Sequence, residues 1–266
     1  QQGPSLHRDH RDMTAISHDF SVGSHPEISV TLASADVTVV EGGAGSIRVE
    51  AEGSDKDLEQ LDIFQTGDVV TIRSRSKGRA WGRRHLTVRI EVPVGVTFAG
   101  HTASGDFSIL VAVSDFDFVT ASGDVHLASF SGRARSKMAS GDLTIGEANG
   151  VLHVGTASGD VRVDSLDGDA QINSASGDVV FGTVSGSVSV KTASGDTTIR
   201  RFAGVNLEGA TMSGDFDIGL VAGMSVDADF HTLSGSFRNL APAGTGERSI
   251  QASMRVKTLS GDIVLR

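Results

Sequence analysis

The residues best placed to do chemistry are aspartates that recur at a constant spacing. Six Ser-Gly-Asp tripeptides follow one another in steps of eighteen residues, and a seventh comes one residue late. Their aspartates are Asp106, Asp124, Asp142, Asp160, Asp178, Asp196 and Asp215. If coils of this length stack, the carboxylates line one edge at intervals of about 5 Å. Calcium, a hard cation that takes carboxylate and carbonyl oxygens, is bound in this way by nonapeptide β-rolls.

The details of the repeat favour turn capping over calcium. Only one glycine precedes each aspartate, and the opposite half-coils carry residues such as Arg133, Val151 and Asp169 at the equivalent place, so paired ligands are missing. An aspartate in a turn can instead accept hydrogen bonds from nearby backbone N–H groups and hydroxyls, capping its own turn. We therefore expect caps, with calcium at Asp106 to Asp196 as the weaker alternative.

A second candidate is a basic segment that contains no acidic residue. It comprises Arg73, Arg75, Lys77, Arg79, Trp81, Arg83 and Arg84. Guanidinium groups recognise carboxylates and phosphates, and a tryptophan can stack on a sugar ring, so this loop could bind an anionic glycan, a lipid headgroup or an acidic partner. The simpler interpretation, a solvated hairpin tip, is the one we favour.

No other residues form a recognisable enzyme or cofactor site. His7 and His10 could chelate a metal but have no clear third ligand, and the serines lie in turns without a histidine and aspartate partner set. The chain contains no cysteine, which excludes disulfides and thiolate chemistry. We predict no enzyme activity and no cofactor.

The charge and hydropathy of the whole chain exclude further classes. The net charge of −10 argues against a general nucleic-acid binder. No apolar run approaches the roughly 18 residues of a membrane span. The chain begins with Gln1, which predicts a mature exported protein whose leader was removed, an arbitrary start within a longer chain being the alternative.

The elements that must position the aspartates are short strands and turns. Glycines recur every nine residues from Gly123 to Gly204, which favours two nonapeptides per coil over three hexapeptides. In each nonapeptide two apolar residues flank a polar one, so Val125 and Leu127 should point inward and His126 outward. The fold class predicted is an all-β parallel β-solenoid, similar to a β-helix or β-roll, with two strands per coil of about eighteen residues.

A third inward residue should fill each corner of the coil. Large side chains stand after one strand, at Phe130, Leu166, Val184 and Phe202. Small ones precede Ser-Gly-Asp, at Ala139, Ala157, Ala175 and Ala193, so that we expect one edge to be narrower.

Three segments follow from the pattern. Residues 1–19 are polar, which predicts an arm or a loosely held strand. Residues 20–100 are expected to form an irregular β lead-in continuous with the solenoid, and residues 101–266 to form the regular solenoid. Ser34-Ala35-Asp36 looks like a degenerate turn of the repeat and supports this continuity, although a boundary between Pro93 and Gly100 is the alternative.

The repeats, together with the segment that precedes them, resemble a known family. Coils of the form T-A-S-G-D-V-x-V follow the segment Ile90-Glu91-Val92-Pro93-Val94-Gly95-Val96, which is the order found in the bacterial putative-adhesin domain family, and the similarity spans residues 20–266. The resemblance implies a β-solenoid in an exported, surface-exposed setting. It implies no mechanism, because that family has no agreed catalytic residues.

The function expected is that of a non-enzymatic structural or adhesive scaffold. The chain ends inside its own motif, so Ile263, Val264 and Leu265 should form an open end that another copy can cover, giving a homo-oligomer or a head-to-tail filament. A module for surface glycans or anions that uses residues 73–85 is the second hypothesis. A carbohydrate-active enzyme is the third and the weakest.

Overall fold

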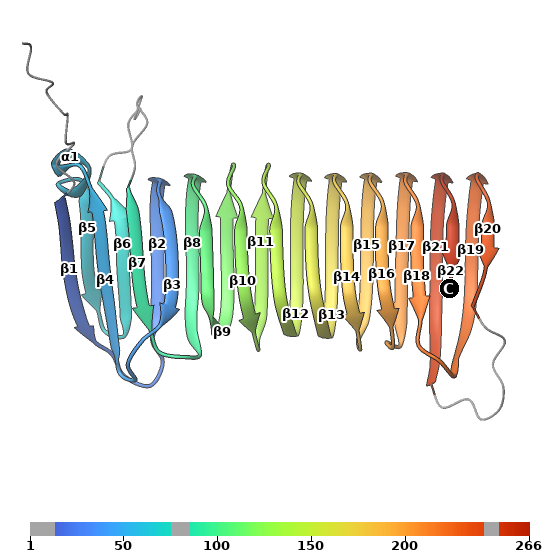
Figure 1. Ribbon diagram of the computed structural model, residues 1–266, viewed down its shortest axis with the longest axis horizontal. Coiled ribbons are helices and arrows are strands. Elements are labelled where there is room, and N and C mark those ends of the chain that lie inside the picture. Colours follow the sequence, from blue (N-terminus) through green and yellow to red (C-terminus); the bar gives the residue numbers. More distant parts are fainter. Residues whose placement is uncertain (1–13, 76–85, 242–249) are drawn as a thin grey trace, which may run out of the picture.

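The chain folds as a β-solenoid in which two parallel sheets face each other. A computed structural model describes residues 14–75, 86–241 and 250–266. These residues form 22 strands and one short helix, α1 (Asp55–Leu58), stacked along one axis into a rod (Figure 1). The all-β parallel solenoid predicted from the repeat is confirmed.

Each coil contributes one strand to each sheet. In order along the rod, sheet I contains β1 (Thr14–Ser21), β4 (Ser46–Gly53), β7 (Thr87–Val92), β3 (Asp36–Glu41), β9 (Phe107–Thr120), β10 (Val125–Phe130), β12 (Leu143–Ser158), β13 (Val161–Ser176), β14 (Val179–Val184), β16 (Thr197–Phe202), β18 (Phe216–Leu220), β22 (Ile263–Leu265) and β20 (Phe237–Asn239). The strands β9, β12 and β13 are long enough to bend from sheet I into sheet II.

Sheet II follows the same axis. In order along the rod, its strands are β5 (Leu61–Thr66), β6 (Val69–Ser74), β2 (Glu27–Ser34), β8 (Val96–Ser104), the second half of β9, β11 (Arg133–Met138), the second half of β12, the second half of β13, β15 (Ser187–Ser194), β17 (Asn206–Ser213), β21 (Ile250–Ser260) and β19 (Met224–Ser234). Among the described residues, antiparallel pairing is confined to the N-terminal end of the rod, where β4 pairs with β1 and β7 and β5 pairs with β6.

The register confirms the eighteen-residue coil. Val125 lies opposite Leu143, which lies opposite Val161, so the same position of the repeat returns in each neighbouring strand. Val125 and Leu127 are buried and His126 is exposed, as the alternation predicts. The apolar side chains of both sheets form one continuous core along the rod.

The coils do not stack in sequence order at either end. β2 and β3 lie between β6 and β7 on one side and β8 and β9 on the other, although β6 and β7 come later in the chain than β2 and β3. The lead-in thus shares the sheets of the repeats, and Asp36 stands in line with the repeat aspartates. At the other end, β21 lies between β17 and β19, and β22 between β18 and β20.

The small corner of the coil is filled by different residues from those expected. Ala157 and Ala193 are exposed, whereas Thr156 and Thr192 beside them are buried. The prediction was wrong because strict alternation continues to the end of the strand, and this turns the threonine inward and the alanine outward. Thr192 Oγ1 donates a hydrogen bond of 3.1 Å to the carbonyl oxygen of Ser194, which satisfies the buried hydroxyl and tightens the turn.

Glycine is required at the positions of the nine-residue series for two different reasons. Gly123 has a φ of 125°, and a Cβ there would lie 2.2 Å from the carbonyl oxygen of Gly105 in the preceding coil. Gly186 lacks a positive φ, yet its Cβ would lie 1.7 Å from the carbonyl oxygen of Gly168. At some half-coils close stacking, rather than the turn conformation, therefore excludes a side chain.

Candidate functional site

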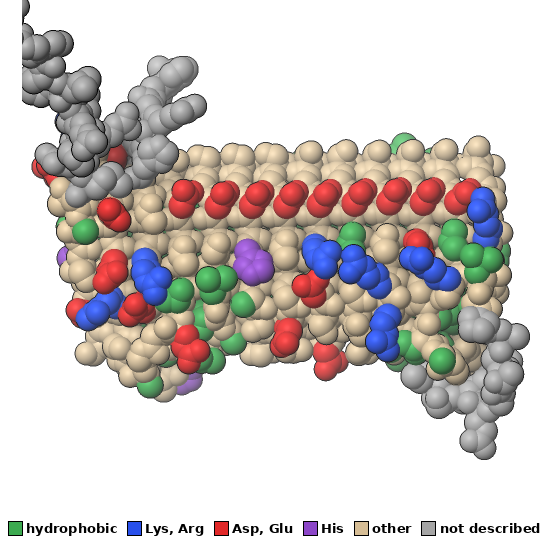
Figure 2. Space-filling model, in the orientation of Figure 1, with side chains coloured by type: hydrophobic (Ala, Val, Ile, Leu, Met, Phe, Trp, Pro, Cys, Tyr) green, Lys and Arg blue, Asp and Glu red, His purple; other side chains and the backbone are tan. Residues whose placement is uncertain are grey.

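The repeated aspartates join the coils to one another. In nine successive steps, the Oδ1 atom of an aspartate accepts a hydrogen bond of 2.7 to 3.1 Å from the backbone N–H of the equivalent residue in the next coil. The accepting residues, called here the Asp ladder, are Asp36, Asp106, Asp124, Asp142, Asp160, Asp178, Asp196, Asp215 and Asp262. They form a straight acidic line along one edge of the rod (Figure 2).

This geometry supports capping over metal binding, with one change to the expected detail. Each aspartate caps the turn of the next coil rather than its own, so the ladder links neighbouring coils. Within residues 14–75, 86–241 and 250–266, no three His, Asp or Glu side chains are grouped so that they could hold a metal ion. His7 and His10 lie outside the described residues.

The last aspartate of the ladder is held by more than one donor. The backbone N–H of Ser236 donates to Asp262 Oδ1 at 2.7 Å, and Arg238 Nη2 lies 3.5 Å from Asp262 Oδ2. Hydrogen bonds from Ser236, with a smaller contribution from the charge of Arg238, hold the pKa of Asp262 below its usual value. This carboxylate links the turn that precedes β20 to the turn that precedes β22.

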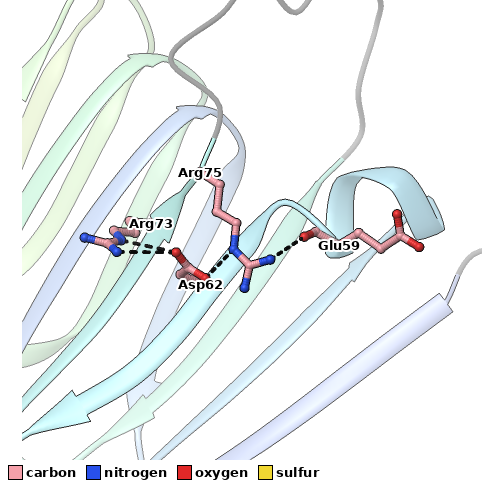
Figure 3. A network of polar contacts seen from close by, with 4 residues as sticks. All are labelled: Glu59, Asp62, Arg73 and Arg75. Atoms are coloured by element: carbon pink, nitrogen blue, oxygen red, sulfur yellow. Dashed lines mark hydrogen bonds and ion pairs between the residues drawn. The ribbon is translucent and has the colours of Figure 1, made fainter.

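The described part of the predicted basic segment forms a polar network beside a groove. Asp62 accepts a hydrogen bond of 2.5 Å from Arg75 Nε and two of 3.4 Å from Arg73, while Arg75 Nη1 also donates to the carbonyl oxygen of Glu59 (Figure 3). The hydrogen bond from Arg75 is the main reason that the pKa of Asp62 is lowered. Two guanidinium groups thus share one carboxylate.

The groove lies on the outer surface of sheet II. It has a volume of about 580 Å³, and Arg73, Arg75, Asp62 and His101 are among the residues that line it. The other predicted members of the basic segment, which are Lys77, Arg79, Trp81, Arg83 and Arg84, lie outside the described residues. Only Arg73 and Arg75 are thus brought together here.

The residues expected to form the open end of the solenoid lie inside it. Ile263 is opposite Phe216 on one side and Phe237 on the other, and Leu265 is opposite Ile218 and Asn239. Ile263 and Leu265 are buried. The expectation that Ile263, Val264 and Leu265 form the free end is therefore wrong, because the last coil in the sequence is inserted before the last coil in space.

The free end belongs instead to β19 and β20, called here the terminal coil (Figure 1). Among the described residues no strand pairs with the outer edge of either one. Val226 and Phe230 face the core yet remain half-buried, and Phe237, whose ring centroid lies 5.1 Å from that of Phe230, is 47% exposed. The described residues thus cover the core incompletely at this end.

An apolar ridge borders the terminal coil. The outward position that precedes Ser-Gly is alanine in the regular coils, such as Ala157 and Ala175, but it is Met212, Leu259 and Leu233 in the last three coils in space. These three side chains are 60%, 50% and 86% exposed. The larger residues were visible in the sequence, but only the order of the coils shows that they lie together.

The sequence contains no apolar run as long as a membrane span, and the helical content of the structure can be compared with this expectation. Over the described residues, no helix has the length and hydropathy needed to cross a membrane.

Comparisons with known proteins agree on the fold. The model of a family described as Toastrack DUF4097 matches residues 25–266. A solved structure described as a putative adhesin from Bacteroides fragilis is similar at 13% identity and a TM-score of 0.50, over 95% of this chain and 97% of that one. No curated protein matches significantly.

Two other solved structures are similar at lower scores, and both come from Parabacteroides distasonis. One, described as a putative adhesin, has 12% identity and a TM-score of 0.44, covering 96% of this chain and 98% of that one. The other, described as a putative lipid binding protein, has 14% identity and a TM-score of 0.46, covering 95% and 96%.

Proposed function

We propose that this chain, which belongs to the Toastrack DUF4097 family, is a non-enzymatic, exported rod that acts as a structural or adhesive scaffold and associates end to end. The observation that carries the proposal is the terminal coil, which the described residues cover incompletely and which ends two otherwise continuous sheets. The fold likeness to a structure described as an adhesin is consistent with a surface setting.

The stiffness of the rod supports a scaffold role. Neighbouring coils are joined by parallel strand pairing in both sheets, by the shared core and by the Asp ladder. Because every coil contacts only its neighbours, added coils lengthen such a structure without changing its cross-section. A long, narrow and rigid body can place a binding end at a distance from its point of attachment.

The terminal coil supports association at the end. An uncovered strand edge presents unpaired N–H and C=O groups that favour pairing with another chain, and exposed apolar side chains add to this tendency. Phe237 and Leu233 offer both features at the same end of the rod. A second copy that stacks on this coil would extend the solenoid and bury them.

The experiment compares self-association of the wild type with that of the double variant Leu233→Lys and Phe237→Lys. Sedimentation velocity over a range of protein concentrations should show concentration-dependent species for the wild type, and these should disappear in the double variant. Electron microscopy of concentrated wild type should show rods joined end to end.

A matched control places the same two charges elsewhere on the rod. Leu110→Lys and Val151→Lys alter side chains that are also exposed but lie on middle coils, and these variants should associate like the wild type. A wild type that stays monomeric at high concentration, or a control that dissociates equally, would refute association through the terminal coil. Protease shaving of intact source cells tests the exported setting, since an intracellular protein would be protected.

A second candidate function is binding of anionic groups or glycans on the side of the rod. The surplus of guanidinium charge around Asp62 favours it, because Arg73 makes only long contacts of 3.4 Å with that carboxylate. Arg73→Gln should weaken binding of an acidic sugar in a glycan-binding assay. An enzyme acting on carbohydrate is the third and weakest candidate, since the described surfaces bring no set of catalytic side chains together.

A further inference from the structure

A row of positive charge runs along the outer surface of sheet II, parallel to the axis of the rod. Strand register places eleven residues side by side in this row, one from each strand from β6 to β19. Six of them are basic or histidine, called here the cationic row: Arg73, His101, Lys137, Lys191, Lys257 and His231.

The row contains no acidic residue between β6 and β19. Its other members are neutral, namely Thr31, Val119, Gly155, Asn173 and Ala210. The neighbouring outward row of the same sheet differs, because it mixes Arg135 and Arg255 with Asp117, Glu208 and Asp229. The cationic row thus carries charge of one sign only, whereas its neighbour carries both, within a protein whose net charge is −10.

The three lysines of the row are available for a ligand. Lys137, Lys191 and Lys257 are exposed, and none of them forms an ion pair with a described residue. At the two ends, Arg73 shares Asp62 with Arg75, and His231 lies 2.7 Å from Asp229. The free charge of the row therefore lies on its lysines.

The surface beside these lysines is hollowed. Lys191 and Lys257 flank Ala210, whose small side chain leaves a depression of about 150 Å³ between them. The larger groove of about 580 Å³ lies at the other end of the same row, beside Arg73 and His101. A polymer lying along the row would pass a lysine at every second or third strand between β11 and β21.

The spacing of the charges suits an extended ligand. Lys137 and Lys191 are three strands apart, and Lys191 and Lys257 are two strands apart. At about 4.8 Å per strand, the three ammonium groups span roughly 24 Å. A single small anion can reach one of them, whereas a linear polymer with repeated anionic groups can reach all three.

We propose that the cationic row binds a linear acidic polysaccharide, with carboxylate or phosphate groups along its backbone, laid along the axis of the rod. Its anionic groups would pair with the lysines and its sugar or polyol units would lie over the neutral residues between them. A nucleic-acid duplex is disfavoured because its charge, about one per 1.7 Å of axis, would meet the acidic residues of the adjacent row and the overall negative charge. The site does not depend on end-to-end association.

The test measures binding of fluorescent polymers by polarisation at two salt concentrations. The probes are a galacturonate decamer, poly(glycerol phosphate), neutral dextran, a galacturonate monomer and a single-stranded DNA oligonucleotide. The variant Lys137→Gln, Lys191→Gln, Lys257→Gln should bind the preferred acidic polymer about tenfold more weakly than the wild type, with a flatter dependence on salt. Comparing the first two probes shows whether carboxylate or phosphate is preferred.

The matched control removes three positive charges from the rest of the rod. The variant Arg162→Gln, Arg200→Gln, Arg201→Gln has the same net charge as the lysine variant but alters exposed residues of β13, in its sheet I half, and β16. It should bind within about twofold of the wild type. Circular dichroism and melting of both variants show whether each is folded.

Several results would overturn the proposal. These are equal losses in the two triple variants, absence of binding to both acidic polymers, binding of the monomer as tight as that of the decamer, or tighter binding of DNA than of either acidic polymer. Sedimentation of the lysine variant separates this site from the terminal coil, since its self-association should match that of the wild type.

Discussion

Asp142 accepts a hydrogen bond of 2.8 Å from the backbone N–H of Asp160, one coil further along the rod. The same contact returns at each step of the Asp ladder, so a carboxylate that looks like a local turn residue in the sequence connects neighbouring coils. Negative charges at about 5 Å intervals repel one another. The backbone donors offset this repulsion at each step.

Removing one carboxylate from the ladder should destabilise the solenoid. Asp160→Ala deletes the acceptor for the N–H of Asp178, and we expect a loss of about 1 kcal/mol in the free energy of unfolding, as for a lost cap. Asp160→Asn keeps an acceptor oxygen and should lose less. Chemical denaturation with circular dichroism measures the difference.

The control for this prediction is Asp169→Ala, which removes an exposed carboxylate from the opposite half of the same coil. It should leave the stability nearly unchanged. Equal losses at Asp160 and Asp169 would show that general charge effects, rather than the ladder, determine stability.

Glycine should be required where coils approach most closely. In Gly123→Ala, the new Cβ would lie 2.2 Å from the carbonyl oxygen of Gly105 at a φ of 125°, so the coils must separate. We expect a loss above about 2 kcal/mol. Gly155→Ala, where nothing lies within 4 Å of the new Cβ, should be tolerated. Thermal melting of both variants checks this contrast, which would fail if the two melted together.

Acid should loosen the terminal coil through Asp262. Because the pKa of Asp262 is lowered in the folded protein, its carboxylate stabilises the fold fully above the unfolded value of about 3.9 and ceases to do so as the pH falls through the lower folded value. Hydrogen exchange of the Ser236 amide, compared between pH 6 and pH 3 after correction for intrinsic rates, should show lower protection in acid. In Asp262→Ala the protection should be low at both values. Unchanged protection in the wild type would contradict the link.

The inserted final coil should stabilise the coil beyond it. A chain truncated before Ile250 lacks β21 and β22, which are the strands that pair with β19 and β20. Hydrogen exchange should then show that β19 and β20 lose protection while β10 and β14 keep theirs, because each coil depends on its neighbours. Retained protection in β19 would mean that the terminal coil can stack directly on β17.

The period of the repeat was enough to predict the coil, the parallel register and the inward position of residues such as Val125 and Leu127. These features depend on alternation and on spacing along the chain, which are local properties. The small corner was predicted wrongly because Ala157 was assigned to it by size, whereas alternation places Thr156 there. Five of the seven residues proposed for the basic loop lie outside the described residues, so that site stays a prediction.

What required the tertiary structure was the order of the coils and everything that depends on it. Strand pairing is a contact between distant parts of the chain, so β21 can lie between β17 and β19 without any change in the local pattern. The sequence alone established a solenoid with an aspartate at one turn of each regular coil. Only the fold decided that Ile263 lies inside it, that Phe237 lies at its end, and that Lys137, Lys191 and Lys257 share one row, because register across strands sets which distant side chains lie side by side.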